Sequence, residues 1–80
     1  MEEKELDACG LACPMPLIKA RGELNNLQPG QVLKVICTDR GSIKDFQGWA
    51  KSAKNVEILK QETQNQNGKE VYIHYIKKTN

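Results

Sequence analysis

The sequence predicts an α/β fold, a two-layer sandwich of order βαβαββ with a four-stranded mixed sheet and two helices on one face. Three observations predict it: two segments with an apolar period of three to four residues, strand-like segments with alternating apolar residues, and an Asn-Gly pair typical of a hairpin. Two βα units followed by a hairpin leave both helices on one side of the sheet. Eighty residues predict a single domain, 1–80.

The first βα unit occupies residues 4–30. Residues 4–7 form a short predicted strand, and a helix is expected to begin within residues 13–16, Cys-Pro-Met-Pro, because proline is tolerated in a first helical turn. Pro29-Gly30 is the predicted stop. The apolar face of this helix is expected to consist of Leu17, Ala20, Leu24 and Leu27.

The second βα unit begins with a β-branched strand over residues 32–38. Its alternation predicts that one set of side chains faces the helices, namely Leu33, Val35 and Cys37. Ser42 followed by Asp45 resembles a capping arrangement that opens the second helix. The apolar stripe of that helix is expected to comprise Ile43, Phe46, Ala50 and Ala53.

Residues 56–62 and 70–77 are predicted strands, joined by a polar segment that ends in Asn67-Gly68. The sheet face away from the helices is left to solvent or to a partner. Alternation alone does not identify its members; the candidates are Val32, Ile36, Tyr72 and Ile76.

Composition excludes several classes of function. The net charge of +2 is scattered and aromatic residues are few, so no direct nucleic-acid partner is expected. No apolar stretch approaches the length of a membrane span, and the acidic first residues do not resemble a signal peptide. Three cysteines, an odd number, favour reduced thiols. We therefore expect a cytoplasmic protein that does not bind a membrane.

Cys13 is the candidate catalytic residue. A cysteine at the start of a helix lies near uncapped backbone N–H groups and the positive end of the helix dipole, which favour a thiolate or a persulfide anion. Serine, threonine, asparagine or aspartate would cap the helix better, which favours reactivity over capping. The alternative is that Cys13 merely fills a turn and the two prolines merely start a helix.

The segment Leu6-Asp7, followed by Gly-Leu-Ala-Cys-Pro-Met-Pro at residues 10–16, resembles the N-terminal signature of the TusA/SirA-like family of small sulfur-carrier proteins. The similarity continues through residues 27–30, Asp39, and Lys44-Asp45 with Gly48, and it covers roughly residues 4–77. This resemblance implies the same βαβαββ sandwich.

The resemblance also implies a site. Cys13 would carry sulfane sulfur as a persulfide, with Gly10, Pro14 and Pro16 as the supporting motif. A donor of the cysteine desulfurase or rhodanese type would load it, and an acceptor protein would receive the sulfur. Positions associated with partner contact or transfer in the family correspond to Arg21 and Asp39. Two departures, Arg40 in place of proline and Ser52 in place of a bulky apolar residue, indicate that the partner differs.

The other thiols and the histidine have alternative roles. Cys9 is a possible secondary thiol that could resolve a Cys13 persulfide, whereas Cys37 is expected to be inert core. Cys37 and His74 lie on separate predicted strands, so the spacing argues against zinc and no metal or cofactor is expected. His74 is expected on the strand surface, and Trp49 at the edge of the core.

Two further functions stay open at this stage. One is a non-catalytic regulatory or adaptor module that binds a protein through the small sandwich. The other is thiol–disulfide exchange through Cys9 and Cys13, although their spacing is not that of a Cys-x-x-Cys motif.

Overall fold

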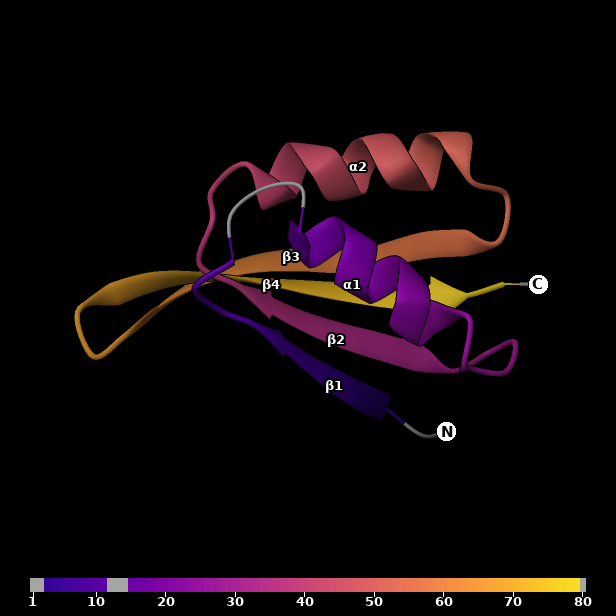
Figure 1. Ribbon diagram of the computed structural model, residues 1–80, viewed down its shortest axis with the longest axis horizontal. Coiled ribbons are helices and arrows are strands. Elements are labelled where there is room, and N and C mark those ends of the chain that lie inside the picture. The colour runs from indigo at the N-terminus through magenta and orange to yellow at the C-terminus, as the bar shows by residue number, and fades with distance from the viewer. Residues whose placement is uncertain (1–2, 12–14, 80) are drawn as a thin grey trace.

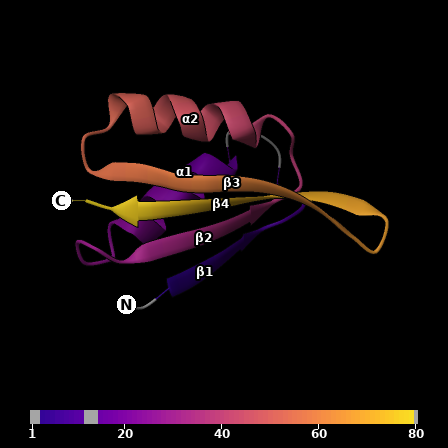
Figure 2. The ribbon, with the colours of Figure 1, turned by 180° about the vertical axis from the view of Figure 1, so that it is seen from behind.

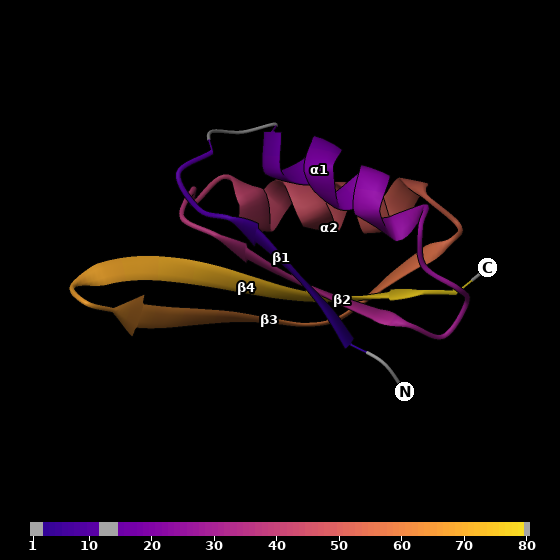
Figure 3. The same ribbon diagram turned by 60° about the horizontal axis from the view of Figure 1, so that its bottom comes forward.

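The computed structural model describes residues 3–11 and 15–79. Its elements are β1 (Glu3–Ala8), α1 (Met15–Leu24), β2 (Val32–Cys37), α2 (Ser42–Ser52), β3 (Val56–Gln66) and β4 (Lys69–Lys78). The strand order is β1-β2-β4-β3, with β1 parallel to β2 and the other two pairs antiparallel. Both helices lie on the same side of this sheet (Figures 1 and 3), which confirms the predicted two-layer sandwich.

One end of the molecule gathers the segments before both helices and the β3–β4 hairpin. The chain leaves β1 and β2 at this end, α1 and α2 begin there, and the β3–β4 hairpin projects beyond it, while the two termini lie at the opposite end (Figures 1 and 2). The projection arises because β4 pairs with β3 as far as Lys69, whereas its pairing with β2 stops at Tyr72.

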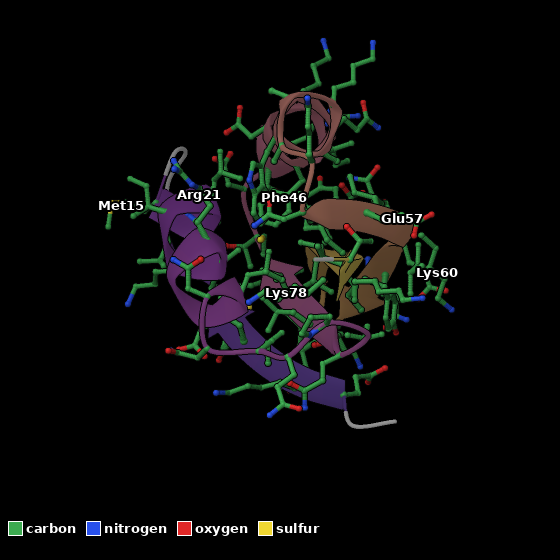
Figure 4. The ribbon with its side chains drawn as sticks, turned by 90° about the vertical axis from the view of Figure 1, so that its right-hand side faces the viewer. Met15, Arg21, Phe46, Glu57, Lys60 and Lys78 are labelled. Carbon is green, nitrogen blue, oxygen red and sulfur yellow. The ribbon has the colours of Figure 1, made fainter. Side chains whose placement is uncertain are left out.

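The core lies between the helices and the sheet. It confirms the predicted face of the first helix and the inward set of β2, because β2 is a central strand with helices over only one of its faces. The predicted stripe of the second helix was only partly right: Phe46 and Ala53 belong to the core with Trp49, whereas Ile43 and Ala50 do not. Phe46 is fully buried, and Figure 4 shows it between α2 and the sheet. The buried cluster consists of Ala8, Ala20, Leu24, Leu27, Leu33, Val35, Cys37, Phe46, Val56 and Ile76.

Two of the four candidates for the open sheet face were wrong. Ile76 pairs directly with Leu33, and residues opposite each other in an antiparallel pair point to the same face. Ile76 therefore faces the helices, and so does Tyr72, four residues earlier on the same strand. Val32 and Ile36 alternate with the inward set of β2 and lie on the open face, as expected.

The open face is covered by its own charged side chains. The ammonium groups of Lys34 and Lys60 lie 5.8 and 4.6 Å from the centre of the Tyr75 ring, and Ile73 on the same face is buried. Lys60 also pairs with Glu62 at 3.4 Å, and Figure 4 shows it pointing away from the helices.

The Asn-Gly turn was predicted correctly. Asn67 and Gly68 have φ values of 53° and 81°, the left-handed pair that a two-residue hairpin turn requires. Both strands of the hairpin are longer than predicted, because polar residues continue the ladder to Gln66 and Lys69. In the described part of the chain, no helix has the length and hydrophobicity to cross a membrane.

Candidate functional site

The segment that carries Cys13 joins β1 to α1. Cys13 and Pro14 lie outside the described residues, so their roles stay predictions. The first described residue of α1 is Met15, which agrees with a helix start within residues 13–16. Pro16 is buried in the first turn of α1 and anchors that turn on the protein.

The loop that leads toward Cys13 is held by hydrogen bonds from its backbone amides. The amide of Gly10 donates to the hydroxyl Oγ1 of Thr38 at 2.8 Å, and the amide of Leu11 donates to the carbonyl oxygen of Ala8 at 3.3 Å. Gly10 has a φ of 82°, which residues with a side chain rarely adopt. The positive φ at residue 10 explains why glycine suits this position in the predicted supporting motif. The part of Gly10 in sulfur transfer stays a prediction.

Cys9, the possible secondary thiol, is exposed in the turn that follows β1. Partial desolvation raises the pKa of its thiol, and a hydrogen bond to Asp7 and the negative charge of that carboxylate raise it further, while Lys69 opposes them. Asp7 in turn accepts the amide proton of Cys9 at 3.0 Å, which lowers the pKa of Asp7. Cys9 is therefore a protonated thiol near neutral pH and a poor nucleophile.

Replacing Asp7 with asparagine should lower the pKa of Cys9 and increase its alkylation rate at pH 7. Asparagine keeps an oxygen that can accept the Cys9 amide proton but removes the negative charge. The measurement is the pH dependence of iodoacetamide alkylation in a Cys13→Ser background. Glu5→Gln, the same change in charge two residues away, is the control. An unchanged pH profile in Asp7→Asn would contradict the role given to this carboxylate.

A cavity of about 570 Å³ opens between the projecting hairpin and the ends of β1 and β2. Lys69 contributes the charged group of its lining. The full lining comprises Cys9, Gly10, Thr38, Gln66, Asn67, Lys69 and Val71. Cys9 and Gly10 precede Cys13 by only four and three residues, so the cavity adjoins the loop that leads to it.

Arg21 and Asp39 lie on different parts of the structure. Arg21 is exposed in the second half of α1 and lines a cavity of about 180 Å³ together with Trp49. Asp39 follows β2, and its carboxylate accepts the amide proton of Gly41 at 3.2 Å, so it shapes the turn into α2. Their contacts with partner proteins stay predictions. Trp49 packs at the edge of the core, as expected.

Cys37 is inert core, as predicted. It is fully buried, and burial raises the pKa of its thiol to about 11 although a hydrogen bond from Ser42 opposes this. A thiol of this kind carries almost no thiolate at neutral pH. No group of three or more metal-ligating side chains occurs among residues 3–11 and 15–79.

His74 was wrongly expected on the strand surface. It is fully buried, stacked on Phe46 with ring centres 4.4 Å apart. Its Nε2 lies 2.9 Å from Oγ of Ser42, and its Nδ1 lies 3.1 Å from Nε2 of Gln61. Burial lowers the pKa of His74 to about 4, so the ring is neutral near pH 7. The apolar residues on either side of His74 in β4 were the sequence signal for this burial.

The hydrogen bonds of Gln61 assign the proton on His74. Nε2 of Gln61 donates to the carbonyl oxygen of Ile43 at 3.2 Å, and the same amide group then donates to Nδ1 of His74. The ring proton is therefore on Nε2 and points to Ser42. The expected cap by Ser42 was wrong, because its hydroxyl faces His74; Gly41 occupies the cap position without a side-chain bond.

Two apolar side chains are exposed on α1 close to the start of the helix. Met15 and Ile18 are 43% and 51% exposed, and their spacing of three residues places them on the same side of the helix. Met15 points away from the sheet in Figure 4. Two exposed apolar side chains therefore lie within five residues of Cys13 in sequence.

Comparison with known proteins shows the family. The family described as "Sulfurtransferase TusA" matches residues 4–78. The chain belongs to the TusA sulfurtransferase family. The match spans all six elements of the fold except the first residue of β1, so it confirms the resemblance derived from the motif at residues 10–16.

Individual relatives carry related names. A protein of Halobacterium salinarum named a putative sulfur carrier protein is 42% identical over 92% of this chain and 86% of its own. The sulfur carrier protein TusA of Allochromatium vinosum is 53% identical over 66% of this chain and 70% of its own. The putative sulfur carrier protein YrkF of Bacillus subtilis is 41% identical over 91% of this chain, which spans only 37% of YrkF.

Proposed function

We propose that this protein is a sulfur carrier that holds sulfane sulfur on Cys13 as a persulfide. The family match over residues 4–78 is the observation that carries the proposal, because named relatives within it are sulfur carrier proteins. The chemistry of the described thiols supports Cys13 as the carrier. Cys37 is buried, and the pKa of Cys9 is raised, so neither provides a ready thiolate.

The helix that follows Cys13 supplies the electrostatic reason why an anionic sulfur would be stabilised at this residue. α1 begins by Met15, two residues after Cys13 in sequence. The first turn of a helix has N–H groups without intrahelical acceptors and carries the positive end of the dipole. A thiolate or persulfide anion near such a helix start is stabilised relative to the neutral form.

Sulfur transfer needs no external oxidant. The Cys13 thiolate attacks the terminal sulfur of a donor persulfide and forms a new S–S bond. The S–S bond of the donor breaks, and the donor thiolate leaves with the electron pair. The same exchange in reverse delivers the sulfur to the thiolate of an acceptor. We propose a donor of the cysteine desulfurase or rhodanese type and an acceptor protein, both in the cytoplasm.

Incubation with a cysteine desulfurase and cysteine should add about 32 Da, the mass of one sulfur atom, to the protein. The adduct should disappear in Cys13→Ala and persist in Cys9→Ser, as measured by intact-protein mass spectrometry. Cys9→Ser is the matched control, because it removes the neighbouring exposed thiol. An adduct that forms equally well on Cys13→Ala would assign the sulfur to another thiol and refute the proposal.

A further inference from the structure

We propose that Thr38 is a positioning residue for sulfur transfer: its hydroxyl holds the loop before Cys13 against the end of β2. This inference rests on the proposed function of Cys13. It assigns to Thr38 neither contact with the sulfur nor a chemical step. Its effect passes through the backbone at Gly10, three residues before the proposed sulfur-carrying side chain.

The bond between Thr38 and Gly10 joins two parts of the chain that are 28 residues apart. It is 2.8 Å long, a good hydrogen-bond distance for an amide and a hydroxyl. The amides of Cys9 and Leu11, by contrast, bond to Asp7 and Ala8, which belong to the preceding strand β1. Of these three amide bonds, only the one to Thr38 reaches beyond β1, to the residue that follows β2. The thiol of Cys9 adds a longer contact with β2, because its Sγ lies 3.9 Å from the carbonyl oxygen of Ile36.

This tie fixes the loop at the point where the chain turns. Gly10 turns the chain with a positive φ, so a change in its orientation redirects the residues that follow it. On the far side of Cys13, the buried Pro16 anchors the first turn of α1. The segment with the proposed carrier is short and lies between these two anchors, and loss of the anchor at Gly10 loosens one end, which the bonds of Cys9 and Leu11 to β1 still hold.

Loss of this anchor should slow transfer rather than prevent it. A thiolate reacts with a partner sulfur only within a narrow range of distances and angles, and a loosened loop spends less time in that range. A single hydrogen bond of ordinary strength corresponds to a rate effect of about three- to tenfold. The thiolate itself is not removed, so the effect should fall on the rate and not on the amount of sulfur that the protein can finally hold.

Thr38→Val is the decisive variant. Valine is β-branched like threonine and nearly equal in shape, but it lacks the hydroxyl oxygen that accepts the Gly10 proton. Thr38→Ser keeps the oxygen and is the matched rescue. Both are made in a Cys9→Ser background, so that Cys13 is the reactive thiol. The rate measured is sulfur transfer from the loaded protein to free cysteine as acceptor, with protein concentration and pH held constant.

We expect Thr38→Val to transfer sulfur about three- to tenfold more slowly and Thr38→Ser to match the parent. A purely structural role would lower the melting temperature and leave the rate of the folded protein unchanged, and that result would overturn the proposal. Equal rates in the valine variant and the parent would also overturn it. If Thr38→Val does not fold, Thr38→Ala takes its place, because alanine also lacks the hydroxyl. A transfer rate equal to that of the parent would then overturn the proposal in the same way.

The experiment separates this inference from the proposed function. If Cys13 does not carry the sulfur, the parent protein itself shows no adduct that depends on Cys13, and the proposed function fails. If the parent carries sulfur on Cys13 and Thr38→Val transfers it at the parent rate, only the role of Thr38 fails.

Discussion

Replacing Phe46 with alanine is expected to lower the free energy of unfolding by about 3–5 kcal/mol. Phe46 is fully buried between α2 and the sheet. Its ring stacks on His74 at 4.4 Å and meets the edge of Trp49 at 5.9 Å, so its removal leaves a cavity and also exposes one face of a buried polar ring. The loss is a large part of the roughly 4–12 kcal/mol expected for a domain of this size.

Urea denaturation followed by circular dichroism measures this change directly. The matched control is Ile18→Ala, because Ile18 is also a large apolar residue of a helix but is 51% exposed. This control should alter the free energy of unfolding by no more than about 0.5 kcal/mol. A Phe46→Ala protein that is as stable as the control would contradict the position of Phe46 at the centre of the core.

Lowering the pH from about 6.5 to about 4 is expected to reduce the stability of the folded protein by about 3 kcal/mol through His74 alone. Burial lowers the pKa of His74 from 6.5 to about 4. In this pH window the unfolded chain binds a proton at His74 and the folded protein does not. Stability therefore rises with pH through the window and is fully present above pH 6.5.

The control for this prediction is His74→Gln, which cannot titrate but keeps polar atoms for Ser42 and Gln61. The free energy of unfolding is measured from pH 4 to 7 for both proteins, and the difference between their slopes isolates His74. The pKa of Asp7 is lowered from 3.8, so its contribution to stability is lost mainly below pH 4, and it is the same in both proteins. Parallel pH profiles for the two proteins would show that His74 is not held neutral by burial.

Local sequence patterns determined the order and type of the elements. The three-to-four-residue apolar period identified the face of the first helix and part of the face of the second, and Asn67-Gly68 identified the hairpin turn, because these features depend on residues close together in the chain. Alternation also gave the correct inward set for β2. One face of that strand is apolar and the other contains Lys34, so only one assignment buries an unbroken apolar set.

Alternation failed for β4. Val71 and Ile73 are buried on one face, and Tyr72 and Ile76 are buried on the other. Because both faces of β4 carry apolar residues, the alternation does not indicate which face is turned toward the helices. The pairing of Ile76 with Leu33 on β2 decides which face meets the helices. That pairing joins residues 43 positions apart, and nothing in the local sequence specifies it.

The candidate site shows the same division between what the local sequence predicts and what the folded structure decides. The signature at residues 10–16 identified the family and predicted Cys13 as the carrier from the chain alone, because the cysteine, its prolines and the helix start are neighbours in sequence. The tertiary structure decided which polar groups hydrogen-bond across the fold. The bonds of Gly10 to Thr38 and of Ser42 to His74 span 28 and 32 residues. They form only when strand register brings those groups within hydrogen-bond distance, which is a property of the folded sheet.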